Sequence, residues 1–185
     1  MDVMDAIHKR RSVRDFASNA VDRTVLHQII DAAIQAPSAI NEQPWRFTVV
    51  QEQPTLDRIS SRAKALLLSA PSGSLPARLQ DMLRNPDFQI FYHAPALVVI
   101  SARADGPWMI EDCALAAENL MLAACAAGLG TCWIGFAQAW LQTPDGKKAL
   151  NLPPECLPVA PIIVGRPRTA APAVPRKEPQ IDWIA

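Results

Sequence analysis

The pattern of apolar and polar side chains along this chain predicts four helices and three strands. Apolar residues recur at helical spacing in the segments 3–10, 22–35, 56–67 and 110–124. Residues 45–50 alternate as in a strand with one better-buried face, and residues 96–100 are continuously apolar, as in a strand covered on both faces. Residues 159–164 form the third predicted strand. This mixture of elements predicts an α+β fold.

Three features depart from a regular period. Residues 69–86 are rich in serine and proline, which predicts a mobile connection or lid. Pro161 lies inside the last predicted strand, and because proline has no N–H group, we expect it at a sheet edge or at a strand start. Residues 166–185 contain four prolines and end on apolar side chains, which predicts an extended arm that lies on a second copy of the chain.

Composition narrows the class of protein. The 185 residues are half hydrophobic, which suits a single domain over residues 1–185. Eighteen basic residues balance eighteen acidic ones, so no overall field attracts nucleic acid or an anionic membrane. The uncharged stretch 120–137 approaches the length of a membrane span, but glycines interrupt it, and a buried helix running into a glycine turn fits better.

The cysteines and histidines indicate neither a disulfide framework nor a metal site. The four cysteines lack Cys-x-x-Cys spacing, and the three histidines are scattered along the chain. The N-terminal residues do not resemble a signal peptide. We therefore expect reduced thiols, no metal and a cytoplasmic location.

Two polar segments are the strongest candidates for chemistry. Arg10, Arg11, Ser12 and Arg14 gather guanidinium groups and a hydroxyl, which suit a phosphate and a neighbouring carbonyl or anionic group. The alternative is a solvated basic helix end. The segment 36–45, Ala-Pro-Ser-Ala-Ile-Asn-Glu-Gln-Pro-Trp, can reach the hydroxyls or ring carbonyls of a ligand, or it is an ordinary turn after a helix. Together the two segments resemble the walls of a pocket for a phosphorylated, planar cofactor.

The third candidate is the glycine-rich segment 128–136, Gly-Leu-Gly-Thr-Cys-Trp-Ile-Gly-Phe. It does not fit a dinucleotide-binding fingerprint, because the glycine spacing differs and the segment follows a helix. Closely spaced glycines let the main chain lie against a flat ring, where a backbone N–H can donate to a ring nitrogen. The alternative is a helix C-cap at Gly128 followed by a tight turn.

These motifs occur in the order characteristic of the nitroreductase superfamily, which the chain therefore resembles. The matching patterns are Arg-Arg-Ser-Val-Arg-x-Phe, Ala-Pro-Ser-x-x-Asn-x-Gln-Pro-Trp and Gly-Leu-Gly-x-x-Trp-Ile-Gly, with Phe-Tyr-His-Ala-Pro at 91–95 and Val-Gly-Arg-Pro at 164–167 as further landmarks. The resemblance implies a nitroreductase-like sandwich, in which helices flank a small mixed or antiparallel sheet and the C-terminal arm is exchanged in a homodimer. It also implies FMN as the cofactor and NADH or NADPH as the transient hydride donor.

The resemblance further implies which residues bind FMN at a site shared between two subunits. The arginine-serine turn would hold the phosphate and the pyrimidine edge, the proline-serine loop would come from the partner subunit, and the tryptophan-isoleucine-glycine segment would lie by the isoalloxazine ring. The implied cofactor-binding residues are Arg10, Arg11, Ser12, Arg14, Pro37, Ser38, Asn41, Trp133, Ile134, Gly135 and, near the C-terminus, Arg176. Arg166 and Lys177 are alternatives for this last position.

The implied activity is an FMN-dependent oxidoreduction with a ping-pong mechanism. Hydride from NADH or NADPH would reach flavin N5, and a nitroaromatic, quinone or similar small molecule would then accept the electrons. No catalytic side chain is predicted, because the flavin carries the chemistry, while Arg14 would stabilise charge on it. The alternative is a flavin-binding module without nicotinamide turnover, serving as a sensor, a carrier or a biosynthetic partner. A hydrolase is disfavoured because the sequence lacks a Gly-x-Ser-x-Gly elbow.

Overall fold

A small antiparallel sheet lies between two layers of helices. The computed structural model describes residues 1–71, 75–103 and 106–184. The strands are β1 (Trp45–Val50), β2 (Ala96–Arg103), β3 (Gly130–Trp133) and β4 (Cys156–Gly165). The helices are α1 (Val3–Lys9), α2 (Arg23–Ala33), α3 (Gln53–Leu68), α4 (Ala77–Arg84), α5 (Met109–Ala126), α6 (Gly135–Leu141) and α7 (Pro144–Ala149), with a short 3₁₀ turn, η1, at Ala39–Asn41.

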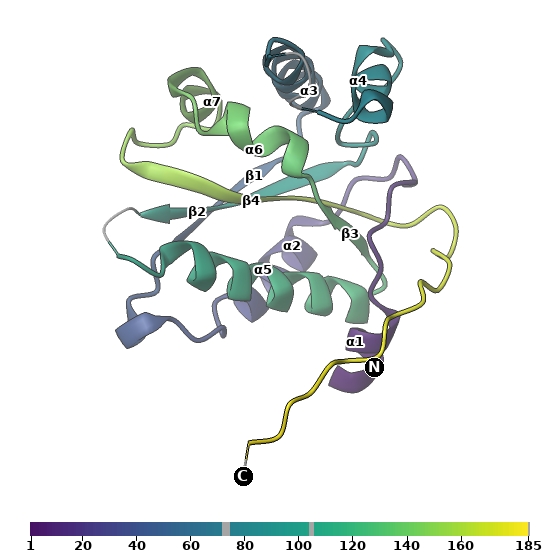
Figure 1. Ribbon diagram of the computed structural model, residues 1–185, viewed down its shortest axis with the longest axis vertical. Coiled ribbons are helices and arrows are strands. Elements are labelled where there is room, and N and C mark those ends of the chain that lie inside the picture. Colours follow the sequence, from purple (N-terminus) through teal and green to yellow (C-terminus); the bar gives the residue numbers. More distant parts are fainter. Residues whose placement is uncertain (72–74, 104–105, 185) are drawn as a thin grey trace.

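The strand order β1-β2-β4-β3 places the two longest strands at the centre of the sheet. Helices α1, α2 and α5 lie on one side of the sheet, and α3, α4, α6 and α7 lie on the other (Figure 1). All three strand pairs are antiparallel. The arrangement confirms the predicted α+β sandwich.

Strand β2 shows how one sheet serves two hydrophobic cores. Its residues 96–102 are all buried. Leu97 and Val99 belong to the core under α3 and α6, whereas Val98 and Ile100 belong to the core under α2 and α5. Successive side chains of a strand point to opposite faces, so a continuously apolar run is what two covered faces require. The prediction of a strand covered on both faces is confirmed.

The segment 69–86 contains more regular structure than the sequence predicts. Helix α4 occupies Ala77–Arg84, so the prediction of an irregular connection is wrong there. Its Leu83 is fully buried, and Lys64 of α3 donates to the carbonyl groups of Asn85 and Phe88 just beyond it. These tertiary contacts stabilise a helix that is too short to be stable by itself. Residues 72–74 of the predicted lid lie outside the described residues.

Strand β4 contradicts the expectation that Pro161 lies at an edge or a strand start. It is the central strand between β2 and β3, and Pro161 lies in its middle. The carbonyl group of Pro161 accepts a hydrogen bond of 2.8 Å from the N–H of Ile134, immediately after β3 ends at Trp133. In an antiparallel strand the nitrogen and the carbonyl group of a residue face the same neighbour. The missing N–H of Pro161 therefore faces Ile134, whose carbonyl group instead accepts a hydrogen bond of 3.1 Å from the N–H of Ala137 at the start of α6.

The glycine-rich segment also forms more structure than a turn. Gly128 has a φ of 73°, the left-handed conformation expected of a residue that ends a helix, and it follows α5 directly. Residues 130–133 then form strand β3, and α6 begins at Gly135. Helices α6 and α7 were not predicted. Among the described residues, none of the helices has the length and apolar content needed to cross a membrane.

Candidate functional site

The arginine-serine turn lies along the outer edge of β3. Ser12 pairs with Thr131 in a parallel bridge, and the N–H of Val13 donates to the carbonyl group of Thr131 at 2.9 Å. Gly130 permits this approach, because a Cβ atom there would lie 2.7 Å from the Cβ of Val13. The segment is extended, so buried Val13 faces the core while its exposed neighbours Ser12 and Arg14 face outward. The fold thus presents a hydroxyl and a guanidinium group side by side.

Arg10 and Arg11 have different partners. The Nε of Arg10 lies 3.5 Å from a carboxylate oxygen of Glu118 on α5. Nη1 of Arg11 donates to the carbonyl groups of His8 and Arg10, both at 2.7 Å, and so satisfies acceptors at the end of α1. The Nε of Arg11 is buried and has no hydrogen-bond partner among residues 1–71, 75–103 and 106–184. Arg11 therefore supports the shape of the turn, and its part in cofactor binding stays a prediction.

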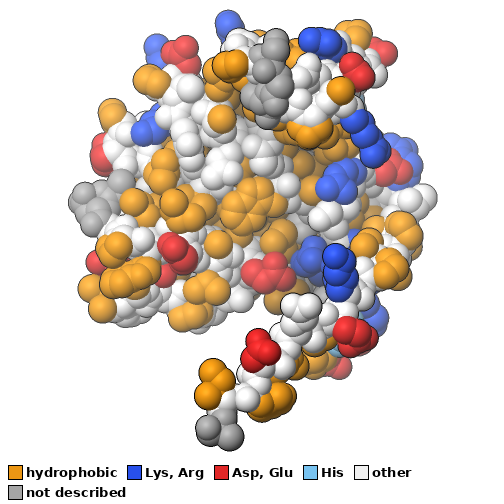
Figure 2. All heavy atoms as spheres, viewed as in Figure 1, with side chains coloured by type: hydrophobic (Ala, Val, Ile, Leu, Met, Phe, Trp, Pro, Cys, Tyr) orange, Lys and Arg blue, Asp and Glu red, His pale blue; other side chains and the backbone are white. Residues whose placement is uncertain are grey.

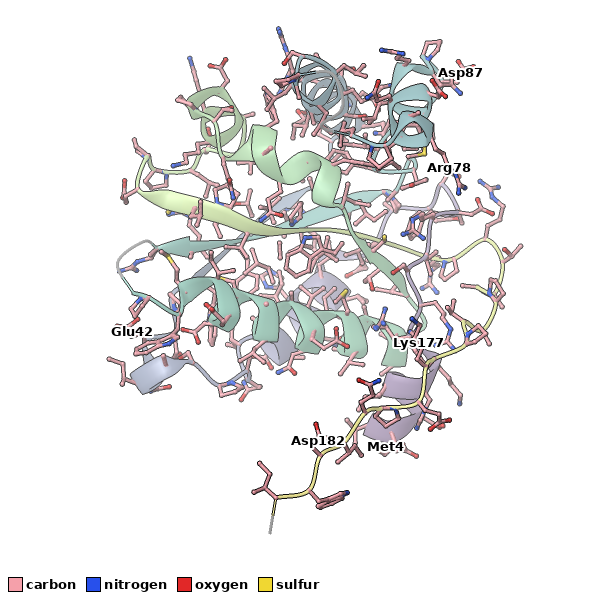
Figure 3. All side chains as sticks on the ribbon, in the orientation of Figure 1. Met4, Glu42, Arg78, Asp87, Lys177 and Asp182 are labelled. Carbon is pink, nitrogen blue, oxygen red and sulfur yellow. The ribbon has the colours of Figure 1, made fainter. Side chains whose placement is uncertain are left out.

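The three basic residues at the end of α1 and start of the turn border one small cavity. Lys9, Arg10 and Arg11 border a space of about 230 Å³, which residues 128–131 and the start of the C-terminal arm also border. In Figure 2, Lys and Arg side chains gather near the place where the C-terminal arm leaves the body of the domain, beside a hydrophobic area across the middle of the face, and Figure 3 shows Lys177 of the arm at this place. A chain of zero net charge thus has a local concentration of cations, which is the electrostatic condition for binding a phosphate.

Arg14 borders a second cavity, of about 310 Å³, together with Tyr92, Cys132 and residues 133–136. Its guanidinium carbon lies 5.9 Å from the centroid of the Tyr92 ring. Burial raises the pKa of Tyr92 and of Cys132, although the charge of Arg14 lowers both in part. Both groups are therefore neutral near pH 7, and Arg14 is the charged side chain of this cavity.

The main chain at the start of α6 is open to a ligand. The N–H of Ile134 is already bonded to Pro161, whereas the N–H of Gly135 has no hydrogen-bond partner within the described part of the chain. Outside α6 and the adjacent residue, a Cβ atom built on Gly135 would meet no atom of the described residues within 4 Å. The structure thus narrows the predicted backbone donor from the pair Ile134 and Gly135 to Gly135. Trp133 is half-buried and packs against the core under α2 and α5.

The proline-serine loop, residues 37–43, lies away from both cavities within one chain. It follows α2, contains η1, and has a polar surface on which Asn41 is exposed and Ser38 half-buried. None of its residues borders either cavity. In Figure 3, Glu42 of this loop lies at one end of α5, whereas Met4 of α1 lies toward the other. The structure therefore does not bring Pro37, Ser38 and Asn41 together with Arg10 and Arg14 in a single subunit.

The arm begins beside the turn and then leaves the domain. Phe16 pairs with Pro167 in an antiparallel bridge, and Arg168 contacts Asp15 at 3.0 Å. From residue 172 to residue 184 every side chain is exposed, and Trp183 is 89% exposed. Figure 1 shows this segment extending past α1 without secondary structure. Arg176 is exposed on the arm and borders neither cavity, so its contact with a phosphate stays a prediction, as do those of Arg166 and Lys177.

Comparison with known proteins identifies the family. The model of the nitroreductase family matches residues 7–166. The chain belongs to the nitroreductase family.

Members of the nitroreductase family resemble the chain over most of its length. A protein of Methanothermobacter thermautotrophicus assigned as NADH dehydrogenase/NAD(P)H nitroreductase is 28% identical over 169 residues, which cover 90% of this chain and 78% of that protein. Nitrobenzene nitroreductase of Ectopseudomonas oleovorans is 29% identical, with 87% of this chain and 85% of the relative covered. A crystal structure of a Bacteroides fragilis nitroreductase with bound FMN has a TM-score of 0.81 and 26% identity, covering 98% of this chain and 95% of that one.

Two residues of this nitroreductase-family site were missed in the sequence. Tyr92 borders the same cavity as Arg14, which lies 78 positions earlier in the chain. Tyr92 and His93 both have a φ of 53°. The Phe-Tyr-His-Ala-Pro pattern at 91–95 pointed to this segment, but it did not predict that the tyrosine lies at the site. Asp112 is buried beneath the proline-serine loop, and its position inside an apolar helical segment was the signal that could have identified it.

Proposed function

We propose that this chain is an FMN-dependent oxidoreductase that takes hydride from NADH or NADPH and passes electrons to a nitroaromatic, a quinone or a similar small acceptor. The observation that carries the proposal is the arrangement along the β3 edge. There, the cationic turn 10–14 and the open main chain of Gly135 lie on the same side of the domain. The nitroreductase with bound FMN from Bacteroides fragilis and the NAD(P)H nitroreductase relative support the choice of cofactor and of hydride donor.

The residues present fit the phosphate end of FMN. Ser12 is exposed at the docked turn, and Arg10 is oriented by Glu118 through its Nε, which leaves its terminal nitrogens for a phosphate. We assign Arg10 and Ser12 to the phosphate, with Arg11 holding the turn behind them. Arg176 from an exchanged arm is proposed to complete this end of the site.

The residues also fit the planar end. A flat ring can approach Gly135 closely, because among the described residues no atom beyond α6 and the adjacent residue lies within 4 Å of the place where a side chain would begin. The free N–H of Gly135 is the proposed donor to the ring, with Trp133 and Ile134 supporting it from the β3 side. Arg14 is the charged group of the adjoining cavity, where the neutral Tyr92 and Cys132 leave its positive charge uncompensated.

We further propose that the site is completed by a second subunit in a homodimer. Pro37, Ser38 and Asn41 lie away from the turn in one chain, so they would reach the cofactor from the partner. The arm supports this arrangement, because Val174, Ile181, Trp183 and Ile184 are each more than half exposed within one chain. A second copy of the chain is a surface on which such an arm can be buried.

When bound, FMN supplies the redox chemistry, accepting hydride and then reducing the acceptor in a ping-pong sequence. The chain's own residues bind and orient it. Arg14 would lie beside negative charge as it develops on the ring, and a cation in a partly enclosed cavity stabilises such charge without transferring a proton. No side chain is assigned to acid or base catalysis.

An anaerobic titration tests the proposal. The purified protein should be yellow, should bleach on addition of NADH or NADPH, and should regain its colour with a nitroarene or quinone. Yellow protein that does not bleach would favour the flavin-binding module without turnover. Colourless protein that cannot be reconstituted with FMN would contradict both.

Arg10→Ala tests the phosphate assignment. Loss of a charge-assisted bidentate contact should weaken FMN binding by about tenfold or more, measured by quenching of FMN fluorescence. Arg168→Ala is the matched control, because Arg168 is also an arginine beside the turn, paired with Asp15, and borders neither cavity. Full flavin occupancy in Arg10→Ala would remove Arg10 from the site.

A further inference from the structure

We propose that Asp112 is a positioning residue that fixes the loop 37–43 and thereby controls FMN binding in the site of the partner subunit. The inference rests on the shared FMN site proposed above. It concerns a residue of α5 that lies outside the arginine-serine turn, the proline-serine loop and the glycine-rich segment.

The loop has one long-range attachment. Asp112 lies in the first turn of α5 and is 3% exposed. Its Oδ1 accepts a hydrogen bond of 3.1 Å from the N–H of Ala39, which is 73 residues away in the sequence. Within residues 1–71, 75–103 and 106–184, the other hydrogen bonds of residues 37–43 join the loop to itself. The carboxyl group of Asp112 is therefore the polar contact that fixes the loop relative to the helical layer.

The backbone of the loop is strained and needs such an attachment. Ile40, Asn41 and Gln43 have φ angles of 45°, 60° and 50°, in the left-handed region that non-glycine residues rarely adopt. Packing does not compensate at the tip, because Ile40 is 85% exposed. A strained conformation persists only where its surroundings determine it. The hydrogen bond from Ala39 to Asp112 attaches the loop immediately before Ile40, the first residue with a positive φ.

Burial disfavours an acid at this position, although a negative charge in the first turn of a helix is itself favourable. The second oxygen of Asp112, Oδ2, is buried and has no hydrogen-bond partner in the described part of the chain. A half-satisfied buried carboxyl group costs free energy, and an apolar side chain of similar volume would remove that cost. An apolar residue, however, cannot accept a hydrogen bond from the N–H of Ala39. The hydrogen bond to the loop is therefore the contribution of the acid that an apolar residue could not replace.

The test compares Asp112→Ala and Asp112→Asn with Asn119→Ala. Asn119 lies on the same helix and donates to the carbonyl group of Ala32 at 3.3 Å, so its removal also costs a tertiary hydrogen bond but does not touch the loop. Two quantities are measured: amide hydrogen exchange of residues 38–43 in the protein without flavin, and the affinity for FMN by fluorescence quenching.

Asp112→Ala should exchange at least tenfold faster in the loop and bind FMN about tenfold more weakly, the effect of losing one hydrogen bond to a charged group. Asp112→Asn keeps an oxygen acceptor and should stay within about threefold of the unchanged protein in both. Asn119→Ala should change FMN affinity less than about twofold. Equal losses of affinity in Asp112→Ala and Asn119→Ala, or no rescue by asparagine, would overturn the proposal.

A variant on the loop side tests the same bond if Asp112→Ala does not fold. Ala39→Pro removes the donor and leaves α5 unchanged, and the preceding Ser38 is extended, with φ −137° and ψ 152°, as a residue before proline should be. It should weaken FMN binding as much as Asp112→Ala is expected to. Unchanged affinity in Ala39→Pro would also overturn the proposal.

Mixed dimers test whether Asp112 acts across the interface. A hybrid of one Arg10→Ala subunit and one Asp112→Ala subunit has both defects in one site and none in the other. It should therefore bind one FMN per dimer with unchanged affinity. If the loop serves its own subunit, neither site is intact and no such binding returns, which would overturn the proposal. A starting protein that binds no FMN would instead defeat the proposed function, and loop exchange would still decide whether Asp112 fixes the loop.

Discussion

The turn 10–14 and the loop 37–43 are both polar segments, but different contacts attach them to the rest of the domain. The turn is docked by main-chain pairing of Ser12 with Thr131 and by the packing of Val13 over Gly130. Among the described residues, the loop has one hydrogen bond to a distant residue, Asp112, and it contains three non-glycine residues with positive φ.

This difference indicates how a shared site divides its tasks. The turn pairs with β3, so the proposed binding groups of Arg10 and Ser12 are in place within a single chain. The loop depends on one contact, and its exposed tip and polar groups lie away from the turn. We infer that the turn determines whether a phosphorylated cofactor can bind and that the loop determines how well the second subunit completes the site.

The largest expected effect comes from undocking the turn. Gly130→Ala would place a Cβ atom within 3 Å of the Cβ and both Cγ atoms of Val13, so the turn must move away from β3. We expect a loss of about 1–3 kcal/mol in the free energy of unfolding, as for overpacked core positions. FMN affinity should fall by about tenfold or more, because Arg10 and Ser12 move together. Urea unfolding and FMN fluorescence quenching measure the two effects.

Gly135→Ala is the matched control, because it adds the same methyl group where, outside α6 and the adjacent residue, no atom of the described residues lies within 4 Å. The free energy of unfolding of the protein without flavin should stay unchanged within about 0.5 kcal/mol. FMN affinity should nevertheless fall, since the added methyl group would meet the ring proposed to lie there. Unaltered FMN affinity would place the ring elsewhere, whereas equal loss of stability in both variants would show that docking of the turn is not specific to Gly130.

A smaller effect is expected within the turn itself. Arg14→Ala should keep FMN affinity within a few-fold, yet slow the reduction of bound FMN by NADH or NADPH by roughly tenfold and lower its reduction potential, because a cation beside the developing charge is lost. Arg14 is exposed, and its hydrogen bond to the carbonyl group of Ser12 is long, at 3.5 Å, so the fold should not change. Rapid-mixing kinetics under anaerobic conditions measure the rate. An unchanged potential and rate would assign Arg14 no part in tuning the flavin.

The sequence predicted those elements whose burial pattern is local and long. The apolar run of β2 and the amphipathic segment of α5 can each be recognised from neighbouring residues alone. Helices α4, α6 and α7 have only 6 to 8 residues and were not recognised by a period, although the equally short α1 was. The three unpredicted helices depend on packing against α3 and β4. The place of Pro161 could not be inferred either, because it depends on where a different strand ends.

The same distinction applies to the candidate site. The arginine-serine turn was found because its groups are adjacent in sequence and their charge is independent of context. The contact of Arg14 with Tyr92 and that of Ala39 with Asp112 join residues more than 70 positions apart. Such contacts follow from the tertiary arrangement of α5, β2 and the preceding loops. A sequence pattern that covers one segment does not contain them.

The smallest expected effect compares two buried thiols, one next to Asp112 on α5 and one on β3, with which the turn pairs. Cys113 follows Asp112, and burial together with the charge of Asp112 raises its pKa to about 12. Cys132 lies on β3, where burial also raises its pKa but the charges of Arg14 and Arg10 lower it in part. A thiol ionises near pH 9 in the unfolded chain, so its contribution to stability is complete below pH 9 and is lost as the pH rises toward the folded-state pKa.

The free energy of unfolding should therefore fall as the pH rises from 9 to 10.5, and Cys113 should contribute more to this fall than Cys132. The slope from one such thiol is at most about 1.4 kcal/mol per pH unit. Cys113→Ala should flatten the pH dependence, measured by urea unfolding under reducing conditions, and Cys132→Ala should flatten it less. Because lysines and tyrosines titrate in the same range in all three proteins, only the differences between them are compared. If Cys132→Ala flattens the curve as much as Cys113→Ala, then the cations of the turn do not compensate the burial of the Cys132 thiol.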